Sequence, residues 1–361
     1  MLNSNKTINL MQLVRPNVLQ MQAYSSARSE FTGQADIYLD ANENPYESGL
    51  NRYPDPLQRA LKKKIAQLKK VAPEQIFLGN GSDEAIDLLL RIFCRPGVDQ
   101  IITLPPTYGM YKVSAALCDV AVKTVPLQAN FQPNVPAILD ASDPQTKMLF
   151  LCHPNNPTGN LLEEAAIIQL LENFPGLVVI DEAYIDFSNE KSNVRLLKQF
   201  PNLVVLQTFS KSWGLAGIRL GMAFASESII ALFNKVKPPY NLNSLTQTAA
   251  LEALKQSATK DLHLQQILEQ RDVLQQQLSG FEFVVKIYPS ATNFLLVKVL
   301  EPQALYQFLL TQKIIVRDRS KTLLCDHCLR FTVGTPAENQ QLLQVLQQYQ
   351  AINSSPQNKN S

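Results

Sequence analysis

The chain has 361 residues, of which 45% are hydrophobic, and its 33 basic and 31 acidic side chains give a formal net charge of +2. This length can bury a large core and allows a smaller second domain. The balanced charge argues against nucleic acid and membrane surfaces as partners, and favours small molecules. Because no apolar run is long enough to cross a bilayer and the N-terminus lacks a signal-peptide core, we expect a cytoplasmic protein.

Residues 36–245 are predicted to form a large domain, because short apolar runs alternate there with amphipathic segments. This alternation indicates an α/β fold with a mostly parallel central sheet and helices on both faces. A further strand is predicted at 222–226, and its short connection to the strand before it allows antiparallel pairing. The apolar runs are 75–81, 100–106, 147–154, 177–184 and 202–211, and the amphipathic segments between them are 82–93, 107–118 and 161–174.

Residues 246–350 are predicted to form a smaller α+β domain. Two long helical patterns come first, and they are followed by four strand-like segments and a last helix at 337–350. Residues 351–361 are polar and lack an apolar period, so we expect a disordered tail there. The helical patterns lie at 242–256 and 262–280, and the strands at 283–289, 292–299, 314–319 and 329–335.

The five cysteines are expected to be reduced thiols, because an odd number of scattered residues does not suit a disulfide framework. Cys325 and Cys328 form a short "CDHC" pair that could hold zinc or a redox disulfide. A metal site would need further ligands, and the only histidines outside that motif are His153 and His263. We therefore predict no metal.

Polar side chains follow three of the predicted parallel strands, at the edge of the sheet where ligands collect in open α/β folds. Asn155 and Asn156 follow the strand in 147–154, and Asp181 follows the next. Lys211 ends the run that contains the third strand. The spacings, 25 residues from Asn156 to Asp181 and 30 from Asp181 to Lys211, suit successive strand–helix units, so these side chains are expected to face one crevice.

Pyridoxal 5'-phosphate is a cofactor that needs this combination of side chains. Lys211 can bond covalently to its aldehyde, and the Asp181 carboxylate can keep its ring nitrogen protonated. Tyr184 and Asn156 can hydrogen-bond its ionised 3-oxygen. Tyr108 is placed to stack on its ring. These roles predict Lys211, Asp181 and Tyr184 as catalytic residues.

The phosphate of such a cofactor would bind where "GNGSDEA" joins a strand to a helix. Free backbone N–H groups and the positive helix end favour an anion there. Ser210 would add a hydroxyl and Arg219 a positive charge. Each feature alone also suits a turn or a helix cap, so the prediction depends on their order along successive strand ends. The predicted helix-start residues are Gly81, Ser82 and Asp83.

Several motifs resemble those of the aspartate-aminotransferase-like, fold-type I pyridoxal phosphate enzymes, and more closely those of the histidinol-phosphate aminotransferases. "NNPTG", "DEAY" and "SKSWGLAGIRLG" match the whole superfamily. "NRYPDP", "YNLNSLTQ" and the pair "VRDR" and "LRFTVGT" match more narrowly. The resemblance runs from about residue 38 to residue 339, most of the chain.

This resemblance implies a homodimer whose active sites lie at the interface between two copies of the chain. Tyr53 would then reach the cofactor phosphate in the partner's site. Residues 1–35 would form an N-terminal arm, and Tyr24 within it would line the substrate pocket.

The resemblance also implies a reaction, in which L-histidinol phosphate and 2-oxoglutarate give imidazole-acetol phosphate and glutamate in histidine biosynthesis. Arg330 is the expected partner of a substrate carboxylate, and Asn156 would also touch the substrate. Arg317 lies 13 residues before Arg330, and two converging guanidinium groups would suit a phosphate. In the alternative interpretation, Arg317 pairs with Asp318 or another surface acid.

Other functions remain open from the sequence. An aromatic aminotransferase or a threonine-phosphate decarboxylase of the same superfamily would share the lysine and the aspartate. A regulator with an aminotransferase-like domain would need a DNA-binding module, for which the residues before position 37 are too few. A nicotinamide dehydrogenase is disfavoured because "GNGSDE" is no complete G-x-G-x-x-G fingerprint.

Overall fold

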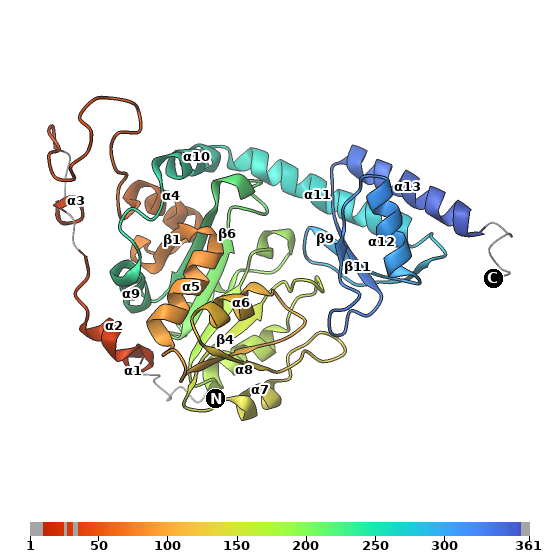
Figure 1. Ribbon diagram of the computed structural model, residues 1–361, viewed down its shortest axis with the longest axis horizontal. Helices are drawn as coiled ribbons and strands as arrows, with labels where there is room; N and C mark the ends of the chain where they lie inside the picture. The colour runs from red at the N-terminus through yellow and green to blue at the C-terminus, as the bar shows by residue number, and fades with distance from the viewer. Residues whose placement is uncertain (1–9, 25–26, 32–34, 355–361) are drawn as a thin grey trace.

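The computed structural model describes residues 10–24, 27–31 and 35–354, and it contains two β-sheets (Figure 1). The larger sheet has seven strands in the order β1-β7-β6-β5-β4-β2-β3. Only β7 is antiparallel to its neighbours, which confirms the predicted α/β class and the antiparallel strand after residue 221. The strands are β1 (Ile76–Asn80), β2 (Gln100–Thr103), β3 (Ala121–Thr124), β4 (Thr146–Cys152), β5 (Leu177–Asp181), β6 (Leu203–Thr208) and β7 (Leu220–Ala225).

Helices cover both faces of this sheet because its central strands are apolar on both sides. In β5, Val178 and Ile180 belong to one buried cluster, while Leu177 and Val179 belong to the cluster on the opposite face. The first face carries α4 (Arg59–Lys69), α7 (Val135–Ala141) and α8 (Glu164–Asn173). The second face carries α5 (Gly81–Phe93), α6 (Met110–Leu117) and α9 (Glu227–Val236).

The second sheet is antiparallel, with the strand order β10-β11-β9-β8. Its core lies between one sheet face and the helices α12 (Pro302–Thr311) and α13 (Pro336–Ser354). Because Leu346 and Tyr349 anchor α13 in this core, the helix continues into the segment predicted as a disordered tail, and residues 355–361 lie outside the described residues. The strands are β8 (Val284–Ile287), β9 (Phe294–Val299), β10 (Arg317–Asp318) and β11 (Cys328–Thr332).

A long helix joins the two sheets. α10 (Ser244–Lys255) and α11 (Ser257–Leu278) are separated only by Gln256, and the predicted domain boundary at 245/246 falls within α10. Figure 1 shows α11 running from α10, beside the first sheet, to the second sheet. Leu264 and Leu268 pack with Tyr184 of the large domain and Phe294 of β9, while Leu274 and Leu278 enter the second core.

The N-terminal segments run along one side of the large domain, next to α9 and α4 (Figure 1). They contain α1 (Leu10–Leu13), α2 (Pro16–Gln20) and α3 (Ala27–Glu30). Val14 and Val18 are buried in the same cluster as α5 and α9, which fixes the start of this segment. None of the helices in the described part of the chain is long and apolar enough to cross a bilayer.

Candidate active site

A pocket lies where β4, β5 and β6 end and α5 begins. All ten residues predicted to hold the cofactor within one chain line this pocket, although they come from segments far apart in the sequence. Cys152, Ala183 and Thr208 line it as well and were not predicted. The ten residues are Gly81, Ser82, Asp83, Tyr108, Asn156, Asp181, Tyr184, Ser210, Lys211 and Arg219.

Asp181 is the last residue of β5, and its buried carboxylate is held by two donors. Tyr111 donates its hydroxyl to Oδ2 at 2.7 Å, and the Ala183 backbone N–H donates to Oδ1 at 3.1 Å. Burial raises the pKa of Asp181, whereas these two hydrogen bonds oppose the shift by favouring the carboxylate. Tyr111 was missed from the sequence, because its contact with Asp181 depends on how α6 packs against the sheet.

Lys211 follows β6 and is half-buried beside the pocket's phenol. Its Nζ lies 5.5 Å from the centre of the Tyr184 ring. Burial lowers the pKa of Lys211, and the nearby positive charge of Arg330 lowers it further, although Asp181 partly offsets both. A lower pKa leaves more of the amine neutral at a given pH, which is the form that attacks an aldehyde.

Tyr184 and Asn156 connect the pocket to the second sheet. The buried Tyr184 ring packs edge-on against Phe294 of β9, with 5.3 Å between the ring centres. Asn156 accepts a hydrogen bond on Oδ1 from Arg330 Nη1. Asn155 instead donates to the Pro106 carbonyl at 2.9 Å, so of the two adjacent asparagines only Asn156 lines the pocket.

The start of α5 forms the anion-binding end of the pocket. Gly81 has a φ of +72° and donates its N–H to the Arg219 carbonyl at 2.6 Å, which sets the helix start against β7. The next N–H groups, those of Ser82 and Asp83, belong to the first helical turn and have no intrahelical acceptor. Arg219 is half-exposed and approaches Asp83 at 3.6 Å, so its guanidinium lies at this end.

Gly221→Ala is expected to weaken cofactor binding, because the added methyl group has no space. A Cβ at position 221 would lie 2.1 Å from both Gly81 C and Ser82 N, which are backbone atoms of the α5 start. The helix would have to shift, at a cost of about 1–3 kcal/mol. Calorimetry should show a lower melting temperature, and titration a weaker affinity for pyridoxal phosphate. Gly217→Ala is the control, since a Cβ there meets nothing within 4 Å.

Three arginines lie on the second sheet near the pocket, and Arg330 contacts the pocket residue Asn156. Arg317 pairs directly with Arg330 across β10 and β11. Arg319, which was missed from the sequence, follows on the same edge; the alternation in "RDR" could have indicated it. Asp318 points away and accepts from Gln303 at 2.7 Å and Ser320 N at 2.8 Å. Among the described residues no ion pair joins Arg317 to Asp318, the alternative drawn from the sequence.

Tyr53 and Tyr24 do not line this pocket. Both border a separate hollow, together with Tyr240 and Asn243. The Tyr53 ring stacks on Tyr240 with 4.5 Å between the ring centres, and Tyr24 is 73% exposed. The expected role of Tyr53 concerns the cofactor site of a partner chain and that of Tyr24 concerns the substrate pocket, and both remain predictions.

The donor set in the pocket fits pyridoxal 5'-phosphate. An amine, a carboxylate, a phenol and an amide surround one space, and a helix start with an arginine supplies the anion-binding end. Lys211, Asp181, Tyr184 and Asn156 would hold the ring, and the start of α5 would hold the phosphate. Within the described residues no His, Cys, Asp or Glu side chains form a group of three that could hold a metal.

Comparison with known proteins gives matches over most of the chain. Residues 35–346 match the family described as "Aminotransferase class I and II". A histidinol-phosphate aminotransferase from Cytophaga hutchinsonii is 53% identical over 94% of this chain and 99% of its own length. One from Parabacteroides distasonis is 52% identical over 94% of this chain and 98% of that protein.

A solved structure agrees with these sequence matches. The histidinol-phosphate aminotransferase from Clostridium acetobutylicum superposes with a TM-score of 0.78 at 26% identity, over 84% of this chain and 92% of that one. The family match over residues 35–346 includes the strands of both sheets.

Proposed function

The chain belongs to the class I and II aminotransferase family, and on this basis we propose that it transfers the amino group of L-histidinol phosphate to 2-oxoglutarate. The products would be imidazole-acetol phosphate and glutamate, a step of histidine biosynthesis. Pyridoxal 5'-phosphate is the proposed cofactor. We propose the cytoplasm as the compartment, because all five cysteines are free thiols, as is usual in a reducing environment.

The proposed chemistry is divided between the cofactor and four side chains. When bound, pyridoxal phosphate supplies an aldehyde that captures an amine and a ring that accepts electrons. Lys211 carries the cofactor and, once free, takes a proton on Nζ from the carbon that bears the substrate's amino group. Asp181, oriented by Tyr111, provides the negative charge for the ring nitrogen. Tyr184 donates its hydroxyl to the cofactor's 3-oxygen.

The observation that supports a phosphate-bearing substrate is the pairing of Arg317 with Arg330 near the pocket. The two guanidinium groups come from directly opposed residues, and within the described chain neither forms an ion pair. Arg330 also reaches the pocket itself through Asn156. Such unneutralised charge suits a phosphate, which carries close to two negative charges at pH 7.

The test is the cofactor's absorbance in the purified protein, recorded before and after addition of histidinol phosphate. We expect the band to change on addition, and borohydride-treated protein to carry the cofactor on Lys211. If aromatic amino acids change the band and histidinol phosphate does not, the proposed substrate is wrong, but the proposed aminotransferase chemistry is supported. Release of carbon dioxide from threonine phosphate would instead identify a decarboxylase.

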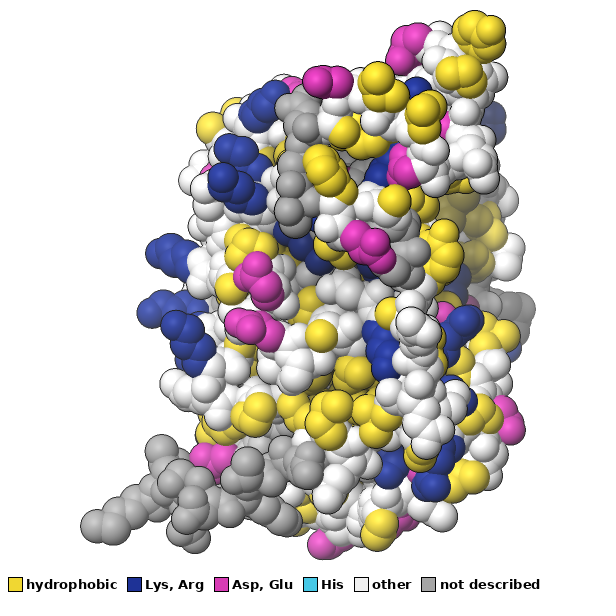
Figure 2. All heavy atoms as spheres, turned by 90° about the vertical axis from the view of Figure 1, so that its left-hand side faces the viewer, with side chains coloured by type: hydrophobic (Ala, Val, Ile, Leu, Met, Phe, Trp, Pro, Cys, Tyr) yellow, Lys and Arg dark blue, Asp and Glu magenta, His cyan; other side chains and the backbone are white. Residues whose placement is uncertain are grey.

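We further propose that two copies of the chain form a homodimer through the face that carries the N-terminal segments. Figure 2 shows hydrophobic side chains distributed over this face of the molecule. Ile37, Leu39 and Tyr46 are each at least 75% exposed there, and Tyr53 is 52% exposed. Burial of these side chains against a second copy would remove a large apolar area from water. Tyr53 would then complete the partner's cofactor site.

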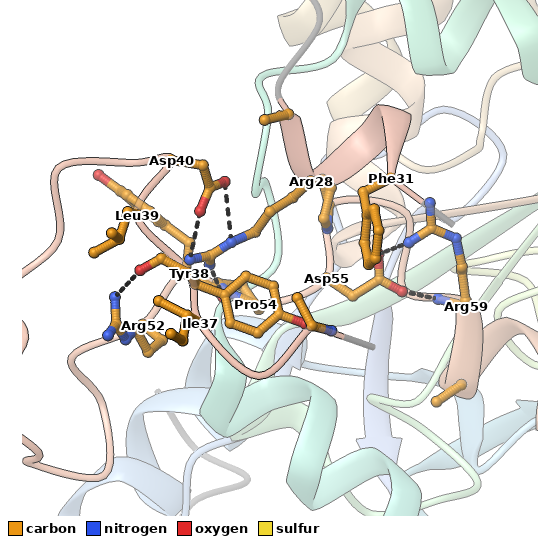
Figure 3. A pocket seen from close by; sticks show the side chains of 15 residues that line it. Arg28, Phe31, Ile37, Tyr38, Leu39, Asp40, Arg52, Pro54, Asp55 and Arg59 are labelled. Atoms are coloured by element: carbon orange, nitrogen blue, oxygen red, sulfur yellow. Dashed lines mark hydrogen bonds and ion pairs between the residues drawn. The ribbon is translucent and has the colours of Figure 1, made fainter. Parts of the chain in front are cut away.

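Glu43 fixes the segment that holds Tyr53. Its buried carboxylate accepts from Arg28, from Arg52 Nη1 at 2.9 Å and from the Tyr53 backbone N–H. Arg28 also lies beside the Tyr38 ring, 5.1 Å from its centre, and pairs with Asp40 at 3.3 Å. Figure 3 shows Arg28 reaching between Tyr38 and Asp40 in the adjoining pocket.

Acidification is expected to loosen this segment and weaken the dimer. Burial would raise the pKa of Glu43, but the hydrogen bonds from Arg28, Tyr53 and Arg52 outweigh it and lower the pKa from 4.5 to about 2. Because the folded pKa is depressed, this stabilisation is complete above pH 4.5 and is lost as the pH falls toward 2. Sedimentation at decreasing pH should show the dimer dissociating within this window.

Glu43→Gln should already weaken the dimer at pH 7, because the amide removes the negative charge that faces Arg28 and Arg52. Glu47→Gln is the matched control, since within the described residues its carboxylate accepts from the Gly49 N–H and pairs with no cation. A Glu43→Gln dimer as tight as the wild type would contradict this role.

A further inference from the structure

A third guanidinium group stands beside the pair formed by Arg317 and Arg330. The Arg319 N–H donates to the Cys328 carbonyl at 2.9 Å, so the pairing of β10 with β11 extends one residue further. Side chains alternate between the two faces of a strand, so Arg317 and Arg319 share a face. Arg330 lies opposite Arg317 and belongs to that face too. One face of this sheet edge therefore presents three arginines.

These arginines have unused hydrogen-bonding capacity. The Nε atoms of Arg319 and Arg330 are both buried and have no hydrogen-bond partner among the described residues. The nearest carboxylate in sequence, Asp318, lies on the other face and is occupied by Gln303 and Ser320. Buried polar atoms in native proteins are normally satisfied, so these two N–H groups are available to a ligand with several acceptor oxygens.

The charge around Arg319 leads to the same conclusion. Burial lowers the pKa of Arg319, and the positive charges of Arg330 and then Arg317 lower it further. The groups that act in the opposite direction are Cys325 and Tyr184, and neither is a carboxylate. Tyr184 also lines the cofactor pocket, so this concentration of positive charge borders the reacting centre.

We propose that Arg319 is a specificity-determining residue that binds the substrate's phosphate together with Arg317 and Arg330. This inference rests on the proposed function and adds a residue to it. A phosphate monoester offers three acceptor oxygens and nearly two negative charges, whereas a carboxylate offers two oxygens and one charge. A third guanidinium therefore favours a phosphate over a carboxylate and over a neutral alcohol.

The test compares histidinol phosphate with histidinol, which lacks only the phosphate, in holoenzymes carrying Arg319→Gln or Arg319→Lys. For Arg319→Gln, we expect the ratio of kcat/KM on histidinol phosphate to that on histidinol to fall about 10- to 100-fold, mainly through KM. Arg319→Lys should recover part of the loss, because lysine restores the positive charge but not the paired N–H donors of a guanidinium. Lys321→Gln, which removes an exposed cation from the same loop, is the control and should leave the ratio unchanged.

A second measurement separates this inference from the proposed function. Inorganic phosphate should bind wild-type holoenzyme, in which the cofactor fills its own site, about tenfold more tightly than Arg319→Gln. If the wild type fails to react with histidinol phosphate and still binds inorganic phosphate more tightly than Arg319→Gln does, the proposed function is wrong and the anion site is supported. Equal phosphate affinity in both proteins, or equal losses on histidinol phosphate and histidinol, would overturn the role of Arg319. Melting temperatures of both variants identify any loss of folding.

Discussion

Lys211→Ala is expected to lower kcat by about 1,000-fold or more, which is a larger loss than we expect for any other substitution. The amine has two proposed tasks, the covalent attachment of the cofactor and the transfer of a proton, and proton transfer alone contributes about 10²- to 10⁴-fold. Among the described residues that line the pocket, Lys211 is the only lysine, so no second amine could replace it. Steady-state kinetics with histidinol phosphate and 2-oxoglutarate would measure the loss.

Mass spectrometry after borohydride treatment gives an independent readout of the same variant. The wild type should carry the cofactor's mass on the peptide that contains Lys211, and the alanine variant should not. Lys255→Ala is the control, since this lysine pairs with Glu252 on the surface of α10, far along the chain from the pocket residues, and should have no effect on either measurement. Near-normal turnover by Lys211→Ala would refute the proposed mechanism.

Asp181→Asn is expected to reduce kcat by about 100- to 1,000-fold while the cofactor still binds. The amide keeps the shape of the side chain but removes the charge that would stabilise the protonated ring nitrogen, and losses of this size follow when one electrostatic partner in a site is removed. The contacts with Tyr111 and Ala183 show that the carboxylate is oriented before any ligand arrives. The absorbance of the bound cofactor should therefore still be detected in Asp181→Asn, whereas its kcat should be reduced.

The neighbouring residue supplies a matched control on the same strand end. Glu182 is equally buried, but it accepts hydrogen bonds from Ser192, Asn193 and Gln207 and does not line the pocket. Glu182→Gln should lower the melting temperature, because a donor replaces one acceptor oxygen, and should preserve kcat in the folded fraction. If the two substitutions reduced kcat equally, Asp181 would have no special role in the chemistry.

The sequence was sufficient to predict the site residues whose position follows from the course of the backbone alone. Lys211 and Asp181 come at the carboxyl ends of neighbouring parallel strands, so the topology of the sheet places them at one edge. The apolar runs identified those strands because β5 and β6 are buried on both faces. The strand-like segments of the second sheet were also predicted, although β8 and β10 are not buried on both faces.

Residues whose position depends on packing could not be found in this way. Tyr111 reaches Asp181 only because α6 presents that side of its surface to the sheet, and nothing in its local sequence specifies the orientation. The alternation in "RDR" could place Arg319 on the same face as Arg317, but its position beside Arg330 follows only from the pairing of β10 with β11. The expected role of Tyr53 depends on a second chain, so neither the periodicity nor the fold of one chain places it at a cofactor.

The helix that joins the two sheets couples the position of the second sheet to the backbone at Gln256. α11 has 22 residues and is therefore roughly 33 Å long. A rotation of only about 5° at Gln256 would move its far end by about 3 Å. That end is buried in the core that carries β11 and Arg330, whereas Lys211 belongs to the other sheet. Substitutions around Gln256 are therefore expected to change which substrates reach Lys211, although they alter no residue in the pocket.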